Sequence, residues 1–293
     1  MMLPRIEGRT AAIVPLFAVT LLAGQFTSGV NLVEVYATVT NQTGEPINGL
    51  TAADFRVAED GAPQTITTFA AGEFPLSVAI GVDRSFSMGG VKGAGKGDRL
   101  TMAKSAAAAF IDALRPDDEV MIVAIGGETE VVQPLTSDRT AARAALDRLD
   151  SWGTTPLYDA TVAALDAIQP ARGRRALLLL SDGTDRYSDT DASTLLEKAR
   201  RQDVLVYPVA IGSTRPPIFA ELATATGGRS FFVQDPRTLS KTLVTVAHEL
   251  RSQYLLGYAP TRPVSPEAQW RTIEVRVQRA DARVRAREGY VGK

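Results

Sequence analysis

Apolar and polar residues alternate near both ends of the chain, as expected of strands that bury one face. Residues 33–39 alternate in this way, and residues 54–70 contain a second alternating stretch interrupted by Asp60-Gly61. An Asp-Gly pair between two alternating runs is a strong signal for a β-hairpin. Residues 271–279 show the same period of two close to the C-terminus. Both ends of the chain are therefore predicted to be β.

The middle of the chain has a different pattern, in which continuous apolar runs alternate with helical segments. A run without polar interruption is typical of a strand buried on both faces of a parallel sheet. Such runs are present at residues 75–82, 119–127, 174–183, 203–212 and 229–234. Helices are predicted between and after them, at residues 99–116, 138–150, 156–170, 192–202, 217–228 and 238–253. This order predicts a doubly wound α/β fold, with a mainly parallel sheet and helices on both faces.

The two terminal β segments are each too short to form a stable sheet alone. We therefore expect them to pair with each other into a small β domain that flanks the α/β domain. The predicted organisation is an N-terminal leader at residues 1–27, a β segment at 30–73, the α/β domain at 74–252 and a second β segment at 253–293.

The first residues have the pattern of a signal peptide. Arg5 and Arg9 precede an apolar run at residues 11–24, which is shorter than the roughly 20 apolar residues that cross a bilayer. The small residues Ala23 and Gly24 offer a cleavage point. We expect an exported protein, secreted or periplasmic, that touches a membrane only if the leader stays uncleaved as an anchor.

Composition excludes several classes of chemistry. The chain has no cysteine, which rules out disulfides, thiol catalysis and cysteine-ligated metals. Its net charge of −1 gives no electrostatic reason to expect a nucleic acid partner. His248 is the single histidine, so the two histidines of a zinc-protease helix are not available. We expect His248 to be a structural or surface residue, and the protein not to be an enzyme.

Oxygen-bearing side chains gather where the predicted strands end. Ligands of open α/β sheets bind at the carboxyl ends of the strands, where neighbouring loops meet. The side chains are Asp83, Ser85 and Ser87 after the first apolar run, Thr154 and Thr155 before the third helix, and Ser181, Asp182 and Asp185 at the end of the third run. Oxygen ligands without histidine or cysteine favour Mg²⁺, Mn²⁺ or Ca²⁺. Capping of the following helix is the alternative interpretation of Asp83, Ser85 and Ser87.

Three short sequences carry this pattern: DRSFS, GTTPLYDA and LLSDGTD. Together they resemble the metal-ion-dependent adhesion site of von Willebrand factor A (VWFA) domains, whose pattern is Asp-x-Ser-x-Ser, then a Thr, then an Asp. The resemblance extends from Phe74 to about Gln253. The flanking β segments resemble those of bacterial VWFA-related proteins of the acidobacterial type.

This resemblance implies a metal site with five ligating residues. The hydroxyl ligands would be Ser85, Ser87 and Thr155. Two carboxylates, Asp83 and Asp182, would act mostly through bound waters. One coordination position of the cation would stay open for a Glu or Asp side chain of a partner protein.

The chain departs from the family pattern in the second of these sequences. The family usually has Gly-Gly-Thr where this chain has Gly153-Thr154-Thr155. Alignment on the following PLYDA favours Thr155, but which of the two threonines reaches the ion stays open.

Two other features have simpler interpretations. Residues 90–98 almost spell a nucleotide-binding P-loop, but Gly97 stands where that loop needs Ser or Thr, so we expect no nucleotide. Arginines crowd the C-terminal β segment and are predicted to be solvated edge charges that prevent aggregation: Arg271, Arg276, Arg279, Arg283, Arg285 and Arg287.

The sequence therefore predicts an exported VWFA-type binding module that recognises an acidic residue of a partner protein through a divalent cation. The alternative is a scaffold or assembly component of the cell envelope, in which the cation is only structural. A metal-dependent hydrolase is the third class, and the chain shows no base for it.

Overall fold

The computed structural model describes residues 32–72, 74–89, 98–263 and 267–292. The predicted leader at residues 1–27 and the glycine- and lysine-rich residues 90–97 lie outside the described residues. What the sequence predicts for these two segments stays a prediction.

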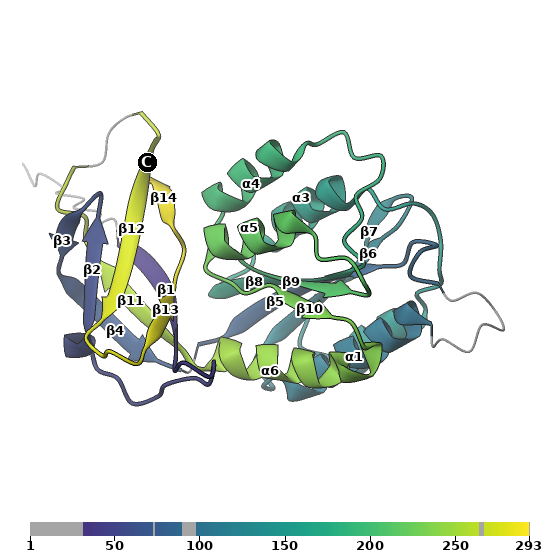
Figure 1. Cartoon of the computed structure of the whole chain (residues 1–293), viewed down its shortest axis with the longest axis horizontal. Helices are drawn as coiled ribbons and strands as arrows, with labels where there is room; N and C mark the ends of the chain where they lie inside the picture. Colours follow the sequence, from purple (N-terminus) through teal and green to yellow (C-terminus); the bar gives the residue numbers. More distant parts are fainter. Residues whose placement is uncertain (1–31, 73, 90–97, 264–266, 293) are drawn as a thin grey trace, which may run out of the picture. The chain divides into compact units, whose positions relative to one another are not determined.

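A six-stranded sheet forms the centre of the α/β part of the chain, in the order β10-β9-β8-β5-β6-β7 (Figure 1). Its strands are β5 (Leu76–Asp83), β6 (Glu119–Ile125), β7 (Thr129–Thr136), β8 (Arg174–Ser181), β9 (Leu205–Ile211) and β10 (Phe231–Val233). All its neighbouring strands are parallel except β6 and β7. Because β5 and β8 are parallel neighbours, their carboxyl ends lie at the same edge of the sheet.

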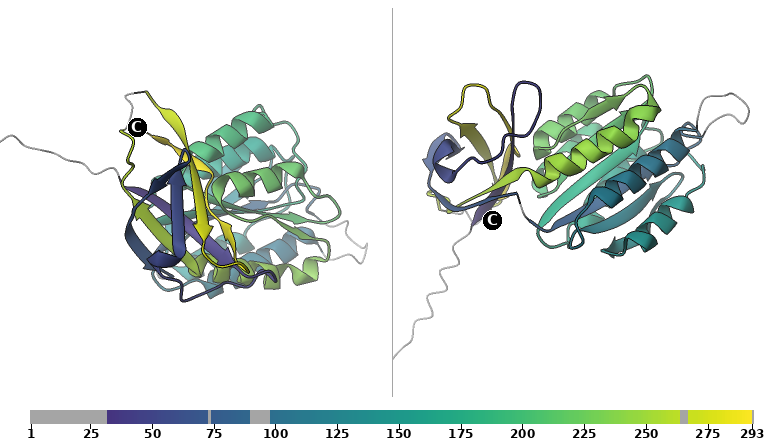
Figure 2. Two further views of the ribbon diagram at one scale, coloured as in Figure 1. Left: turned by 60° about the vertical axis from the view of Figure 1, so that its left-hand side comes forward. Right: turned by 90° about the horizontal axis from the view of Figure 1, so that it is seen from below.

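Helices cover both faces of this sheet (Figure 1, Figure 2). They are α1 (Arg99–Ala113), α2 (Arg139–Asp147), α3 (Leu157–Ile168), α4 (Ala192–Arg201), α5 (Pro217–Thr226) and α6 (Leu239–Arg251); two short 3-10 helices are η1 (Ala52–Asp54) and η2 (Pro236–Thr238). Residues of α1, α2 and α6 share one apolar core with the sheet, and residues of α3, α4 and α5 share another. In the described parts of the chain, no helix has both the length and the apolar character needed to cross a membrane.

The two ends of the chain form two four-stranded sheets, in the orders β13-β1-β11-β4 and β14-β12-β2-β3. Their strands are β1 (Val33–Thr40), β2 (Phe55–Glu59), β3 (Ala62–Gln64), β4 (Ile66–Ala71), β11 (Gln253–Tyr258), β12 (Gln269–Val277), β13 (Arg283–Arg285) and β14 (Gly289–Gly292). The sheets share one apolar core, to which β1 contributes its alternating residues Val33, Val35, Ala37 and Val39. Each sheet contains strands from both ends of the chain, as the sequence predicts; the domain limits at residues 74 and 252 stay predictions.

The predicted α/β fold is confirmed, with one strand that the sequence pattern does not indicate. β7 pairs antiparallel with β6 at the edge of the large sheet. It contains Pro134, its residues are only partly buried, and its register with β6 shifts twice. A proline removes one donor from the strand ladder and is tolerated at sheet edges. This segment therefore shows neither clean alternation nor a continuous apolar run.

The prediction of solvated edge arginines is wrong for Arg271. Its side chain is 1% exposed and pairs with the equally buried Glu59, with 2.8 Å between Nη1 and Oε1. The hydroxyls of Tyr258 and Tyr290 each donate a hydrogen bond of 2.9 Å to Glu59 Oε2. The reason is the period of the strand, since Arg271 lies on the face of β12 that also buries Ile273.

Candidate metal site

Asp83 and Ser181 end the neighbouring strands β5 and β8 and are joined directly. The Ser181 hydroxyl donates a hydrogen bond of 2.6 Å to Asp83 Oδ2, and both residues are fully buried. The backbone N–H of Ser85 donates to Asp83 Oδ1 at 2.9 Å, as in the turns that Asp side chains commonly make with the residue two positions on. The Asp83 carboxylate therefore fixes the start of the loop that carries Ser85 and Ser87.

Backbone hydrogen bonds connect this loop with the loop before α3. The N–H of Trp152 donates to Arg84 O at 2.7 Å, and the N–H of Phe86 donates to Gly153 O at 3.1 Å. Gly153 has a φ of +82°, and a Cβ at this position would lie 2.2 Å from the backbone N of Gly127. The close approach of the two chains therefore requires glycine at position 153.

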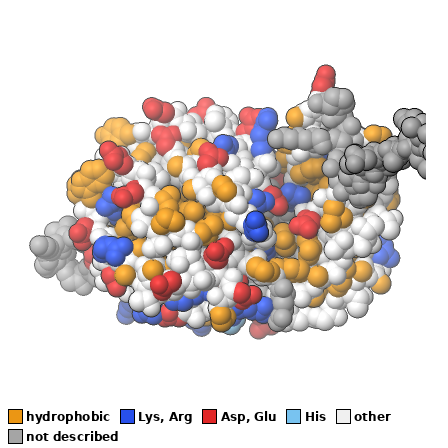
Figure 3. Space-filling model, turned by 180° about the vertical axis from the view of Figure 1, so that it is seen from behind, with side chains coloured by type: hydrophobic (Ala, Val, Ile, Leu, Met, Phe, Trp, Pro, Cys, Tyr) orange, Lys and Arg blue, Asp and Glu red, His pale blue; other side chains and the backbone are white. Residues whose placement is uncertain are grey.

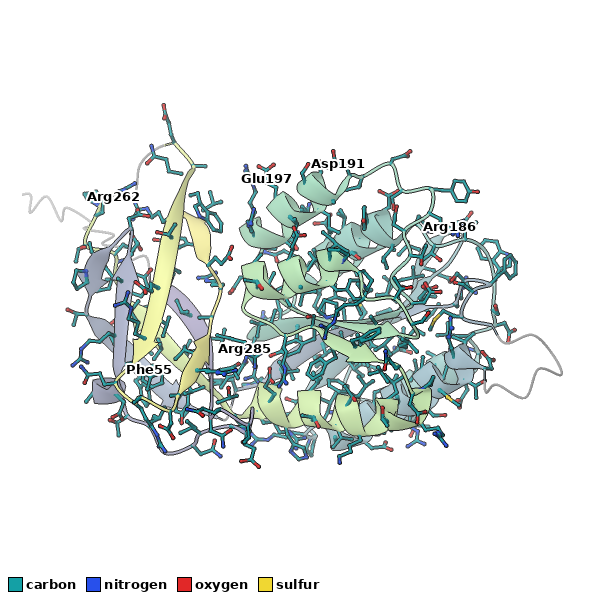
Figure 4. The ribbon with its side chains drawn as sticks, viewed as in Figure 1. Phe55, Arg186, Asp191, Glu197, Arg262 and Arg285 are labelled. Carbon is teal, nitrogen blue, oxygen red and sulfur yellow. The ribbon has the colours of Figure 1, made fainter. Side chains whose placement is uncertain are left out.

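The hydroxyls predicted to bind the cation differ in exposure. Ser85 Oγ and Ser87 Oγ are 3.0 Å apart, with Ser85 buried and Ser87 exposed. Thr155 is buried and Thr154 is exposed, so Thr155 is the threonine whose side chain the protein encloses. The carbonyl of Thr155 accepts a hydrogen bond of 2.7 Å from the N–H of Arg186, which ties Thr155 to the loop after β8. Figure 4 labels Arg186 in this loop.

Burial determines the electrostatics of Asp83. It raises the pKa of this carboxyl to about 6, and the nearby Asp182 adds to the rise, whereas hydrogen bonds from Ser181 and Ser85 oppose it. The ionised form is therefore costly in this environment unless a positive charge lies nearby. A divalent cation would supply such a charge.

Arg99 brings a positive charge to the site that the sequence pattern does not predict. Its Nη1 lies 3.8 Å from Asp182 Oδ2 and donates a hydrogen bond of 3.4 Å to Ser87 O. The guanidinium also packs against Gly212 at the end of β9, where a Cβ would lie 3.3 Å from Arg99 Cζ. Asp182 Oδ1 accepts a hydrogen bond from the N–H of Thr184 at 3.2 Å. Only the fold brings Arg99 here, because no spacing in the sequence relates it to Asp182.

Helix capping, the alternative interpretation of Asp83, Ser85 and Ser87, is wrong. The N-cap of α1 is Asp98, whose Oδ1 accepts a hydrogen bond of 2.9 Å from the N–H of Leu100. Hydroxyl and carboxylate oxygens are ligands that Mg²⁺ and Ca²⁺ accept, so the donor set fits a small divalent cation. Over the described residues, no group of three or more His, Cys, Asp or Glu side chains could hold a metal ion. The predicted set contains only two such side chains, Asp83 and Asp182.

Comparison with known proteins gives a family match within the α/β part. A family model described as the von Willebrand factor type A domain matches residues 78–184. An uncharacterized protein of Borreliella burgdorferi is 24% identical over 185 residues, which are 54% of this chain and 54% of that protein. The chain thus spans about half the length of the curated relatives it matches.

Solved structures share the fold at low sequence identity. The conserved hypothetical protein BatB from Bacteroides thetaiotaomicron has a TM-score of 0.50 at 20% identity, and the match covers 60% of this chain and 100% of BatB. The vWF domain of the type V pili tip protein Mfa5 from Porphyromonas gingivalis has a TM-score of 0.51 at 12% identity, covering 60% of this chain and 95% of that one. At these identities the likeness concerns the fold alone.

Proposed function

The chain contains a von Willebrand factor type A domain, and we propose that it is an exported binding module that recognises an acidic residue of a partner protein through a divalent cation. Binding of proteins is the typical role of such domains. The observation that carries the proposal is the group of oxygen-bearing side chains on three hydrogen-bonded loops at one edge of the sheet: Asp83, Ser85, Ser87, Thr155 and Asp182. Export is proposed from the signal-peptide pattern of residues 1–27.

Each residue of this group would have a distinct role. The hydroxyls of Ser85, Ser87 and Thr155 would hold the cation directly, and Asp83 and Asp182 would orient bound waters. When bound, a cation held largely by neutral hydroxyls would keep much of its charge and one open position for a partner's carboxylate. Asp83 keeps the Ser85 backbone in place through its 2.9 Å hydrogen bond, so the position of this residue does not depend on a bound cation.

A structural role for the cation is the second candidate, and the loops argue against it. The loop after β5 is joined to the loop before α3, and that loop to the one after β8, by backbone hydrogen bonds of 3.1 Å or less. Loops that protein hydrogen bonds already hold together do not need a cation for their position. A binding role therefore accounts better for the oxygen ligands than a scaffold role does.

Hydrolysis is the least supported class. His248 is exposed on α6, and its carbonyl accepts a hydrogen bond of 3.0 Å from the Ser252 hydroxyl. The prediction of a structural or surface position for this histidine is thus confirmed.

Water proton relaxation of the Mn²⁺-loaded protein tests the proposal. An open coordination position holds an exchangeable water, so we expect the relaxation enhancement to fall as N-acetylglutamate is titrated in and displaces that water. An enhancement that N-acetylglutamate leaves unchanged would favour the structural role, and absence of Mn²⁺ binding would contradict both candidates. Ser85→Ala is expected to lose the bound Mn²⁺, while Ser193→Ala on α4 serves as the matched control.

A further inference from the structure

Each of the three loops that carry the candidate metal site also carries an exposed aromatic side chain. Phe86, Trp152 and Tyr187 are 66%, 46% and 79% exposed, and each lies in a different one of the three site loops. They are three of the six large hydrophobic side chains that are exposed over the described residues. Single exposed apolar side chains are normal, but a group of them around one site marks an interaction surface. In Figure 3, hydrophobic side chains are visible at the left-hand end of the molecule, the end that carries Arg186 in Figure 4.

The backbone bonds between the loops hold these residues near one another. Phe86 and Trp152 themselves donate the backbone hydrogen bonds that join the loop after β5 to the loop before α3. Tyr187 directly follows Arg186, whose N–H bonds to Thr155 O. Phe86 and Trp152 therefore take part in hydrogen bonds between two site loops, and Tyr187 is one position from such a bond.

The side chain of Trp152 is fixed by its surroundings. The indole of Trp152 packs so closely on Gly127 that a Cβ there would lie 2.9 Å from the ring. The Arg84 guanidinium lies 5.3 Å from the centre of the Trp152 ring. Tyr187 has a φ of +68°, a backbone conformation that residues other than glycine rarely adopt. A side chain packed as that of Trp152 is loses little entropy when a partner binds.

We propose that Phe86, Trp152 and Tyr187, together called the aromatic rim, bind apolar side chains on either side of the acidic residue of a protein partner. The inference rests on the proposed function, which places the partner's carboxylate at the candidate metal site. Aromatic residues and arginine are the groups that most often dominate protein interfaces. The partner is therefore a protein segment in which Asp or Glu stands between large apolar residues.

Charge complementarity favours this partner over a neutral sugar, which aromatic rings also bind. Arg84 lies against the Trp152 ring, and its Nε is buried without a hydrogen-bond partner among the described residues. Arg99 lies beside Asp182 at the same site. Two guanidinium groups and a bound cation would attract a carboxylate, whereas a neutral sugar has no charge to match them.

Selection from a random peptide library on the immobilised protein tests the inference. The library is applied with MgCl₂ and eluted with a chelator, after titration calorimetry has established Mg²⁺ binding. We expect the eluted peptides to carry one Asp or Glu with aromatic or aliphatic residues within two positions. For a peptide so selected, Trp152→Ala and Tyr187→Asn should each weaken binding about tenfold or more, with the affinity for Mg²⁺ unchanged. Asn is used at position 187 because it tolerates a positive φ.

Trp270→Ala is the matched control, because Trp270 is the other tryptophan of the chain, is exposed and lies on β12. Acidic peptides without apolar neighbours, or binding that the rim substitutions leave unchanged, would overturn the inference and leave the proposed function intact. No chelator-eluted peptide, together with Trp152-dependent capture on an array of neutral glycans, would overturn it in favour of a sugar ligand. Failure of the calorimetric titration to detect Mg²⁺ would overturn the proposed function itself, and the inference with it.

Discussion

Asp83 has the most unusual environment of the five proposed ligating residues. It is fully buried and its pKa is raised to about 6, chiefly because burial disfavours the charged form. Its hydrogen bonds from Ser181 and Ser85 compensate only in part. The ionised carboxylate therefore destabilises the folded protein in the absence of a cation and stabilises it when a cation binds.

Asp83→Asn is therefore expected to separate metal binding from folding. Without metal, the free energy of unfolding should change by no more than about 1 kcal/mol, because removal of the buried charge offsets the loss of one of the two acceptor oxygens. With saturating MgCl₂, the stabilisation seen in the parent protein should disappear. Urea denaturation with and without MgCl₂ measures both effects. Asp112→Asn, at an exposed ion pair with Arg143, is the control and should keep the stabilisation by Mg²⁺. If Asp83→Asn also keeps this stabilisation, Asp83 does not take part in binding the cation.

At this scale the sequence predicts the motif residues and misses their neighbours. Asp83, Ser85 and Ser87 lie at alternate positions directly after a strand, so a local pattern suffices to find them. Arg99 and Trp152 are brought to the site by elements whose relative positions depend on the packing of the whole sheet. No local pattern encodes such contacts.

At the scale of elements, the sequence signals that predict the structure correctly are those of residues that favour one particular backbone conformation. Asp60 and Gly61 both have a positive φ, of 48° and 80°, and they join β2 to β3 in the hairpin that the Asp-Gly pair predicts. The sequence does not predict β7, because an edge strand with Pro134 and a shifting register has no regular pattern to detect.

Gly153→Ala tests how strongly the loops depend on one another. Alanine at a positive φ costs about 1 kcal/mol from the backbone alone, and its Cβ would also meet the backbone of Gly127 at 2.2 Å. We expect a loss of unfolding free energy clearly above this figure, together with Mg²⁺ binding weakened severalfold. Chemical denaturation and calorimetry give the two quantities.

Gly49→Ala isolates the contribution of the backbone to that result. Gly49 has nearly the same φ, +80°, but a Cβ there would meet no described atom within 4 Å. It should cost about 1 kcal/mol and leave Mg²⁺ binding unchanged. Equal effects of the two substitutions would mean that the contact between Gly153 and Gly127 does not hold the site.

At the scale of the whole molecule, the pairing of the two chain ends follows from the shortage of strands in each. Because each end has too few strands for a stable sheet, the ends are predicted to pair, but this argument does not say which strand pairs with which. β1 lies between β11 and β13, and β12 lies between β2 and β14. These pairings depend on contacts between residues about 200 positions apart, such as Leu255 with Tyr36, for which a single sequence has no local signal.

Glu59 connects both chain ends in the buried interior, and we expect its substitution to cause the largest loss of stability. It lies on β2 and accepts hydrogen bonds from Arg271 on β12 and from Tyr258 on β11. Glu59→Ala leaves a buried guanidinium without its counter-charge, although the carbonyls of Arg262 and Pro263 still accept from it, and leaves the hydroxyls of Tyr258 and Tyr290 without their acceptor. We therefore expect a loss of about 3–5 kcal/mol in the free energy of unfolding. Urea denaturation measures it, and Glu274→Ala, which removes an exposed partner of Arg276, should have little effect. A small loss at Glu59 would show that the buried pair contributes little to the β part.

Calorimetric titration of Mg²⁺, Mn²⁺ and Ca²⁺ into the protein and into its Ser85→Ala/Ser87→Ala variant tests whether these two hydroxyls bind a divalent cation. The two hydroxyls are 3.0 Å apart, and alanine fits wherever serine does, so we expect the variant to fold. We expect at least one of these cations to bind to the parent protein and none to bind to the folded variant. Equal binding by both proteins would place the cation elsewhere, and absence of binding by the parent protein at millimolar concentrations would contradict the proposed function.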